Sequence, residues 1–147
     1  SYRGKMLRPA LLLLTAKAAG GVRPAHRTLA AVVEMVHMAT LVHDDVLDEA
    51  KERRRRPTIA AIAGNQAAVL LGDFLISHAF HLCSSLNDQY ASRRIGAVTN
   101  VVCEGELLQN AQRRNPDLSE NDYYAVIQRK TGALTAGALA RRAAKRA

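Results

Sequence analysis

Apolar residues recur along most of the chain at the three- and four-residue spacing of helices, and no stretch alternates with the period of two that strands require. Glycines and prolines interrupt this pattern near positions 20, 57 and 116. The pattern predicts helices over residues 9–19, 24–48, 59–86, 91–113, 119–130 and 132–147, with a polar connection at 49–57. Thr58 and Ser119 stand where side-chain oxygens cap helices. The expected fold class is an all-α helical bundle.

The second predicted helix ends in a run of acidic residues. Between residues 30 and 47 it is apolar on most faces, which is typical of a helix buried in a bundle. His37, Asp44 and Asp48 share one stripe of this helix, because seven residues return to within roughly 20° of the same direction. The carboxylates stand at the helix C-terminus, where the macrodipole disfavours negative charge by roughly 0.3–1 kcal/mol per residue. They therefore need a cationic partner. Oxygen ligands suit Mg²⁺, which we expect Asp44 and Asp48 to bind.

Four arginines follow this acidic run at positions 53–56. Guanidinium groups bind phosphate oxygens through two parallel hydrogen bonds, so Arg53 and Arg54 beside a metal site indicate a polyphosphate ligand. The alternative is a solvated acidic helix end followed by a basic turn. It is disfavoured because the helix is apolar right up to its charges. Asp45 points about 100° away from Asp44, and we expect it to support the motif through hydrogen bonds.

Composition limits the class of protein further. The chain has 147 residues, enough for one hydrophobic core, so residues 1–147 are expected to form a single domain. A hydrophobic content of 48% with only 4% aromatic residues favours helices over sheets. No run approaches the ~20 uncharged apolar residues of a membrane span, and no signal-peptide pattern is present. We therefore expect a cytoplasmic protein without a transmembrane segment.

The formal net charge of +8 raises the possibility of a nucleic-acid partner, because basic residues bind phosphates. The basic residues are dispersed, however, and aromatic residues do not alternate with them to stack on bases. No zinc-finger spacing or other nucleic-acid motif is recognisable. A polyphosphate ligand already accounts for the cluster of arginines at 53–56. We therefore expect no nucleic-acid partner.

Six stretches of the sequence resemble, in order, the motifs of one enzyme family. They are GKMLRP (4–9), EMVH (34–37), DDVLD with a following arginine pair (44–54), NQAAVLLGDFL (65–75), CEGELLQ (103–109) and KT (130–131). Together they cover nearly the whole chain and resemble the trans-isoprenyl (polyprenyl) diphosphate synthases. Each stretch alone would be a weak signal, whereas six in the family's order are a strong one.

The resemblance implies the helical bundle of the isoprenoid synthases. It also implies a Mg²⁺-dependent, head-to-tail condensation of isopentenyl diphosphate with an allylic diphosphate, and a homodimer, for which the apolar helix 91–108 is a candidate interface. By resemblance, the metal ligands are Asp44 and Asp48, the isopentenyl diphosphate site is Lys5, Arg8, His37 and Arg54, and the allylic diphosphate site is Arg53, Lys130 and Thr131. Of these, the residues expected to be catalytic are Asp44, Asp48, Arg53 and Lys130.

Some of these residues carry little weight individually. Lys5 and Arg8 alone would count as surface charges. A lone histidine on an apolar helix more often fills the core, but His37 lies two turns before the acidic run on the same face. Glu106 and Gln109, three residues apart, fit a cavity-facing pair or an internal polar network equally well.

In this family the residues below the first aspartates set the length of the product. Here these are Ala39 and Thr40, which are both small. Small side chains here form an open floor, which means that they do not block the path of the growing chain. An open floor favours a medium- or long-chain product. Ile76 or Phe80 of the neighbouring helix could still close the path.

The sequence departs from the family in one respect, because no second aspartate-rich motif follows the KT pair. That motif supplies further Mg²⁺ ligands, so we expect the 147-residue chain to be inactive by itself. In decreasing order of weight, the chain is part of a full synthase, a natural subunit that needs a partner, or a degenerate binding protein. The alternative function is therefore a non-catalytic diphosphate-binding partner subunit of a heteromeric synthase.

Overall fold

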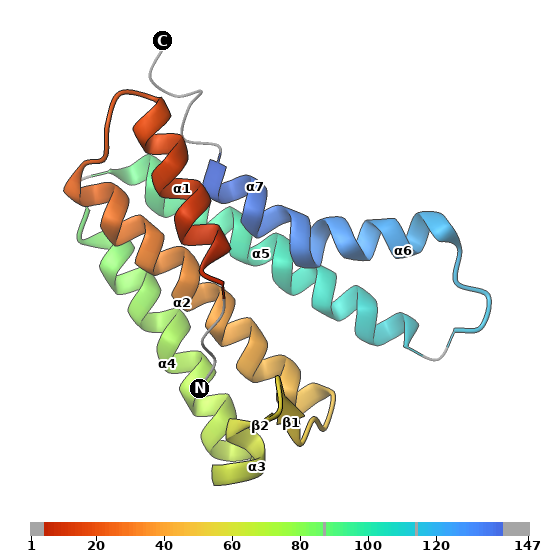
Figure 1. Cartoon of the computed structure of the whole chain (residues 1–147). Coiled ribbons are helices and arrows are strands. Elements are labelled where there is room, and N and C mark those ends of the chain that lie inside the picture. Colours follow the sequence, from red (N-terminus) through yellow and green to blue (C-terminus); the bar gives the residue numbers. More distant parts are fainter. Residues whose placement is uncertain (1–4, 87, 114, 140–147) are drawn as a thin grey trace.

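The computed structural model describes residues 5–86, 88–113 and 115–139. The elements are α1 (Leu7–Ala18), α2 (Pro24–Leu47), β1 (Glu52–Arg53), β2 (Arg56–Pro57), α3 (Ile59–Ala63), α4 (Asn65–Ser84), α5 (Gln89–Gln112), α6 (Glu120–Ile127), a π-helical turn (Gln128–Gly132) and α7 (Ala133–Leu139). This confirms the predicted all-α class (Figure 1). The part of the predicted last helix that follows residue 139 lies outside the described residues.

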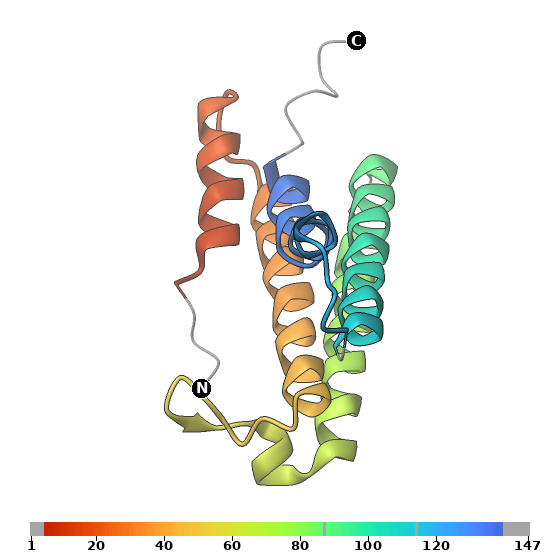
Figure 2. The ribbon, with the colours of Figure 1, turned by 90° about the vertical axis from the view of Figure 1, so that its right-hand side faces the viewer.

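Helix α2 is the centre of the bundle, with α1 on one side and α4 and α5 on the other (Figure 2). Its start at Pro24 follows the preference of proline for the first helical turn, where no backbone donor is needed. Val32, Val33, Val36 and Val42 of α2 are at most 1% exposed. Each buried side chain of this kind contributes roughly 1.5–3 kcal/mol. This apolar stripe therefore fixes the position of the acidic run at the end of the helix.

Helix α4 runs antiparallel to α2 and packs along it (Figure 1). Gly72 permits this close approach, because a Cβ at that position would overlap the His43 ring. His43 Nε2 lies 3.2 Å from the Val69 carbonyl oxygen and 3.4 Å from Asp73 Oδ1. The histidine that precedes the acidic run is thus held between the two helices.

The outer face of α4 is apolar. Leu70 and Phe74 are 60% and 61% exposed. Within the described part of the chain, α4 is the one helix long and apolar enough to cross a membrane, by length and composition only, and 22% of its most apolar window is buried. We regard it as a helix of the bundle, because His43 of α2 is seated against its inner face.

Residues 59–86 form two helices instead of the single one that was predicted. Gly64 adopts φ 86°, a conformation that other residues rarely adopt, and separates α3 from α4. The prediction was wrong because a glycine inside an apolar helical pattern is compatible with either a break or a continuous helix. Thr58 caps α3 as predicted, since its Oγ1 accepts a hydrogen bond from Ala61 N at 3.1 Å.

The connection predicted at 49–57 contains a minimal antiparallel ribbon, in which Glu52 pairs with Pro57 and Arg53 pairs with Arg56. No strand was predicted here, because strands of two residues are too short to show alternation. The turn residues Arg54 and Arg55 have φ angles of 53° and 60°, as in a tight hairpin turn. This left-handed conformation costs roughly 1–2 kcal/mol for each non-glycine residue. The ribbon thus holds a strained arginine tip beside the end of α2.

Candidate functional site

The three carboxylates of the acidic run lie at the C-terminal end of α2. Asp44 and Asp45 are only 8% and 1% exposed, whereas Asp48 is the exposed C-cap residue. Asp48 N donates to the Asp44 carbonyl oxygen at 2.8 Å, so these two residues span one helical turn. Carboxylates buried at the negative end of a helix dipole require positive partners. Each of the three has one.

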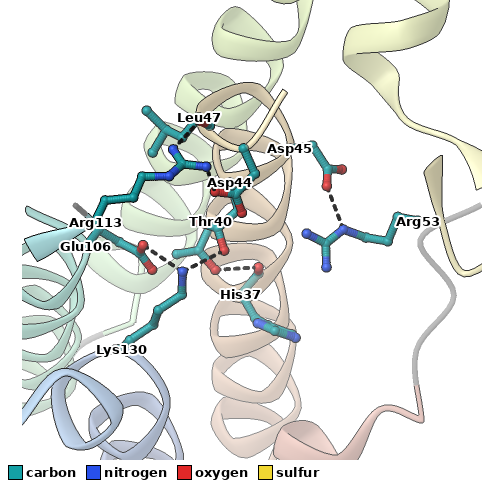
Figure 3. Close-up of polar contacts among 10 residues, drawn as sticks. His37, Thr40, Asp44, Asp45, Leu47, Arg53, Glu106, Arg113 and Lys130 are labelled. Carbon is teal, nitrogen blue, oxygen red and sulfur yellow. Dashed lines mark hydrogen bonds and ion pairs between the residues drawn. The ribbon is translucent and has the colours of Figure 1, made fainter. Parts of the chain in front are cut away.

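Lys130 is the partner of Asp44. Its Nζ lies 3.1 Å from Asp44 Oδ2 and 2.8 Å from Glu106 Oε2, so one ammonium bridges carboxylates from α2 and α5 (Figure 3). Lys130 projects from the π-helical turn, an irregularity often found at functional sites. Gly105 lets this turn pack directly on α5, since a Cβ there would lie 2.8 Å from Lys130 N. Glu106 is thus part of a polar network, one of the two interpretations left open for it.

The electrostatics of this group follow from two carboxylates sharing one cation. Burial by itself lowers the pKa of Lys130, but the hydrogen bond to Glu106 and the charge of Asp44 outweigh burial and raise it. Burial raises the pKa of Glu106, and Lys130 only partly opposes that rise. When both carboxylates are ionised, they outnumber the single ammonium, and the net negative charge of the group then suits a divalent cation.

Arg53 reaches Asp45 from the other side of α2 (Figure 3). Its Nε donates to Asp45 Oδ1 at 2.7 Å, and Asp45 is almost completely buried. The contact agrees with the expectation that Asp45 supports the motif through hydrogen bonds. It also fixes the start of the ribbon relative to α2 and leaves the two terminal guanidinium nitrogens of Arg53 outside this bond.

Arg113 is a site residue that sequence reasoning missed. Located at the C-cap of α5, it donates from Nη2 to Asp48 Oδ1 at 3.0 Å and from Nη1 to the Leu47 carbonyl oxygen at 2.8 Å. Both charged side chains are about half exposed, at 51% and 45%, so this ion pair contributes only about 0–1 kcal/mol. No local signal pointed to it, because the contact joins chain segments on different helices.

A second charged group surrounds His37. Burial, followed by the positive charges of Arg8, Arg54 and Arg53, lowers the pKa of His37 to about 4, so the imidazole is neutral near pH 7. Arg8 Nε is buried and finds no hydrogen-bond partner among the described residues. Burial also lowers the pKa of Arg8, and Glu34 opposes this effect. Arginines that gather around a neutral histidine in this way suit an anionic ligand.

Two of the predicted residues lie at the edge of these groups. Lys5 precedes α1 and is exposed, and Thr131 is exposed beside Lys130 in the π-helical turn. Gly4, which opens the GKMLRP stretch, lies outside the described residues. The structure thus forms two groups from the predicted residues: Asp44 with Lys130, and His37 with Arg8, Arg53 and Arg54.

Asp44 and Asp48 can supply only part of the coordination shell of Mg²⁺. Among the described residues, no group of three or more His, Cys, Asp or Glu side chains could hold a metal ion. Asp44 and Asp48 offer two carboxylates one turn apart, which suffices for Mg²⁺ when water and phosphate oxygens complete its shell. Lys130 and Arg113 hold these same carboxylates. The site therefore suits a metal that arrives with a phosphate ligand.

Comparisons with known proteins agree with the motifs. The family model for polyprenyl synthetase matches residues 1–145. The chain is 43% identical to octaprenyl diphosphate synthase of Escherichia coli (strain K12) over 131 residues, which covers 89% of this chain and 41% of that protein. The crystal structure of a decaprenyl diphosphate synthase from Rhodobacter capsulatus gives a TM-score of 0.90 at 40% identity, covering 93% of this chain and 42% of that one. A polyprenyl synthase from Caulobacter crescentus, complexed with calcium and isoprenyl diphosphate, gives 0.90 at 39% identity, with the same coverage of 93% and 42%.

These matches cover most of this chain but less than half of each relative. The chain spans about two fifths of the length of these relatives, 41% and 42% in the first two cases. Within that span the match covers nearly every residue of this chain and reproduces its fold. The chain therefore belongs to the polyprenyl synthetase family.

Proposed function

We propose that the protein is a prenyltransferase that condenses isopentenyl diphosphate with an allylic diphosphate, head to tail, to give a trans-polyprenyl diphosphate. Two groups of residues with opposite charge, close together along α2, carry this proposal. Asp44 and Asp48 form an acidic pair suited to Mg²⁺, and the positive charges of Arg8, Arg53 and Arg54 gather around His37 nearby. A reaction between two diphosphates needs two adjacent anion sites, of which one has metal ligands.

The first step breaks the C–O bond of the allylic diphosphate, and the electron pair leaves with the diphosphate. When bound, Mg²⁺ neutralises the charge of that leaving group. Asp44 and Asp48 are its proposed ligands, and Arg53, Lys130 and Thr131 are the proposed contacts to phosphate oxygens. Lys130 is suited to a change of partner, because it pairs with Asp44 and could turn to a phosphate oxygen if Asp44 instead held a metal ion.

The second substrate is held beside the first. Lys5, Arg8 and Arg54 are the proposed contacts to the diphosphate of isopentenyl diphosphate, and the neutral His37 offers a hydrogen bond without adding charge. Positioning the double bond next to the allylic carbon lowers the entropic part of the barrier. The double bond attacks the cationic carbon to form the new C–C bond. A proton then passes to the released diphosphate, which restores a double bond.

The small residues below the acidic pair support a medium- or long-chain product. Ala39, one turn before it, is fully buried and has only a methyl side chain, so no bulky side chain closes the path at this position. Phe80, one candidate for closing the path, is 37% exposed and lies near α5, where a Cβ on Gly96 would be 3.9 Å from its ring. This position argues against a role for Phe80 as the floor.

We also propose that the protein is a homodimer located in the cytoplasm. The large exposed apolar side chains favour α4 as the interface, more than the helix at 91–108 suggested by the sequence. Ile62, Leu70 and Phe74 are 69%, 60% and 61% exposed on α3 and α4. An apolar face of this kind is typical of an interaction surface, and a twofold axis would bury it against its own copy.

The test is incorporation of radiolabelled isopentenyl diphosphate with Mg²⁺ and geranyl, farnesyl or geranylgeranyl diphosphate as primer. It is run on this chain and on the full gene product that contains it. We expect incorporation by the full product, a loss of about 10²-fold or more with Asp44→Asn, and little change with Asp117→Asn, an exposed control. We expect this chain alone to be inactive but to bind Mg²⁺ with inorganic diphosphate.

Incorporation and diphosphate binding, measured together, distinguish the prenyltransferase from the non-catalytic partner subunit. Diphosphate binding without incorporation by the full product would favour the non-catalytic partner subunit. The absence of both, or an Asp44→Asn variant as active as the wild type, would refute the proposal. The length of the product formed from each primer tests the open-floor argument.

A further inference from the structure

The end of the bundle opposite the acidic run carries an exposed basic surface, which we call the basic end. The C-terminus of α1, the N-termini of α2 and α5 and the end of α7 meet there (Figures 1 and 2). Its exposed basic residues are Lys17, Arg23, Arg27, Arg93 and Arg94. At 1.5 Å per residue, Asp44 lies about 26 Å further along α2 than Arg27. The basic end is therefore separate from the proposed diphosphate sites.

Acidic residues are nearly absent from this end. In the described segments that form it, residues 14–30, 79–86, 88–97 and 133–139, Asp88 is the one acidic residue. Its side chain is engaged in capping α5, where it accepts a hydrogen bond from Ala91 N at 3.2 Å. Five basic side chains thus face solvent with little compensation. A surface of this kind attracts a polyanion or an anionic membrane.

Apolar features at the same end distinguish these two partners. A pocket opens there between α1, α2, α5 and α7, and its lining includes Leu12, Leu29, Ile95, Tyr90 and Arg94. Most of this lining is apolar, with the Arg94 side chain beside it. Val22 and Tyr90 are also exposed, at 41% and 43%. Apolar side chains and a tyrosine surrounded by arginines suit the boundary between lipid headgroups and acyl chains.

We propose that the basic end is a docking surface for an anionic phospholipid membrane. The basic residues contact the headgroups, and Val22 and Tyr90 lie at the level of the acyl boundary. A nucleic acid would use the same charges but would gain nothing from the apolar pocket, and it offers no partner for Val22. Binding of this type is peripheral and reversible, since it uses exposed side chains and no membrane-spanning segment.

This surface goes beyond the proposed condensation and can be tested without it. If the reaction is as proposed, the product is a lipid, and docking would place the basic end of the bundle against the membrane that receives this product. Vesicle binding does not require turnover. Failure of one proposal therefore leaves the other open to its own test.

The experiment is sedimentation of this chain with phosphatidylcholine vesicles that contain or lack phosphatidylserine, at low and at physiological salt. Arg27→Glu with Arg93→Glu reverses two charges at the basic end. Lys51→Glu with Arg56→Glu makes the same change in net charge among exposed residues at the other end. We expect binding only to the anionic vesicles, weakened by salt. Because each basic residue contributes roughly fivefold, the first variant should bind at least about twentyfold more weakly. The control should change by less than about threefold.

Several results would overturn the proposal. They are no binding to anionic vesicles, unchanged binding by Arg27→Glu with Arg93→Glu, and an equal loss in the control, which would indicate a general effect of net charge. Tighter binding to a single-stranded oligonucleotide than to the vesicles, lost in the same variant, would assign the surface to nucleic acid instead. If charge reversal reduces helicity in circular dichroism, the neutral pair Arg27→Gln with Arg93→Gln replaces it, with the same expected twentyfold loss, on the order of five per residue.

Discussion

Replacing Lys130 by methionine tests whether one ammonium holds two carboxylates together at the junction of α2 and α5. Methionine keeps an unbranched apolar stem but removes the charge. Asp44 and Glu106, with side chains 12% and 20% exposed, would then face each other without a cation. Removing one partner of a buried ion pair costs about 3–5 kcal/mol. Because the Lys130 side chain is 25% exposed and water can reach the gap, we expect about 2–4 kcal/mol near pH 8.

This loss should shrink in acid, for a reason that can be worked out from Glu106. Burial raises the pKa of Glu106 in the folded protein, and Lys130 opposes the rise. Without the ammonium, the pKa rises further. A carboxyl group with a raised folded pKa favours folding fully below its unfolded pKa of about 4.3 and loses that contribution as the pH rises through the folded pKa. Lys130→Met should therefore approach wild-type stability as the pH falls from about 8 towards about 5.

Urea unfolding followed by circular dichroism at these two pH values measures the effect. Lys51→Met, which removes an exposed lysine, is the matched control and should change stability by less than about 0.5 kcal/mol. Adding Glu106→Gln to Lys130→Met should recover about half of the loss or more, because it removes one of the two facing charges. Wild-type stability of Lys130→Met near pH 8, or a loss that is the same at both pH values, would refute the reasoning.

Three further predictions concern other contacts of the site. His37 should titrate near pH 4 by nuclear magnetic resonance, and titration near 6.5 would contradict the burial argument. The neutral imidazole supports folding fully above about pH 6.5, and this support is lost as the pH falls through the folded pKa of His37. His37→Gln should therefore reduce the loss of stability in acid. Gly72→Ala should destabilise by about 1–3 kcal/mol in thermal unfolding, since the added methyl group meets the His43 ring. Gly96→Ala, with its nearest neighbour 3.9 Å away, should be neutral or stabilise by up to about 1 kcal/mol, and equal melting temperatures for the two variants would count against the packing argument. Arg113→Gln should change stability by less than about 1 kcal/mol. It should strengthen Mg²⁺ binding in calorimetry without diphosphate, because the substitution frees the Asp48 carboxylate that Arg113 pairs with. Weaker Mg²⁺ binding by the variant would contradict this account.

Much of the fold could be predicted because its signals are local. The helix α2 was predicted from its apolar stripe, its proline at the first turn and the charges at its end. The caps at Thr58 and Ser119 were predicted from single polar side chains, and both accept the expected backbone hydrogen bonds. Local signals failed where two outcomes are equally compatible with the sequence. Gly64 breaks the helix that was predicted at 59–86, and Gly72 does not.

The sequence by itself determined the helices, the stripe that carries His37, Asp44 and Asp48, and the family, because periodicity and ordered motifs are properties of the chain. Only the tertiary structure decided which positive charge meets which carboxylate. Lys130 reaches Asp44 because a π-helical turn packs on Gly105, and Arg113 reaches Asp48 from the end of another helix. Such contacts depend on how helices approach one another, and the space between helices is set by residues that carry no charge. Gly105, which has no side chain, is therefore as necessary for the ion pair between Lys130 and Asp44 as the two charged residues are.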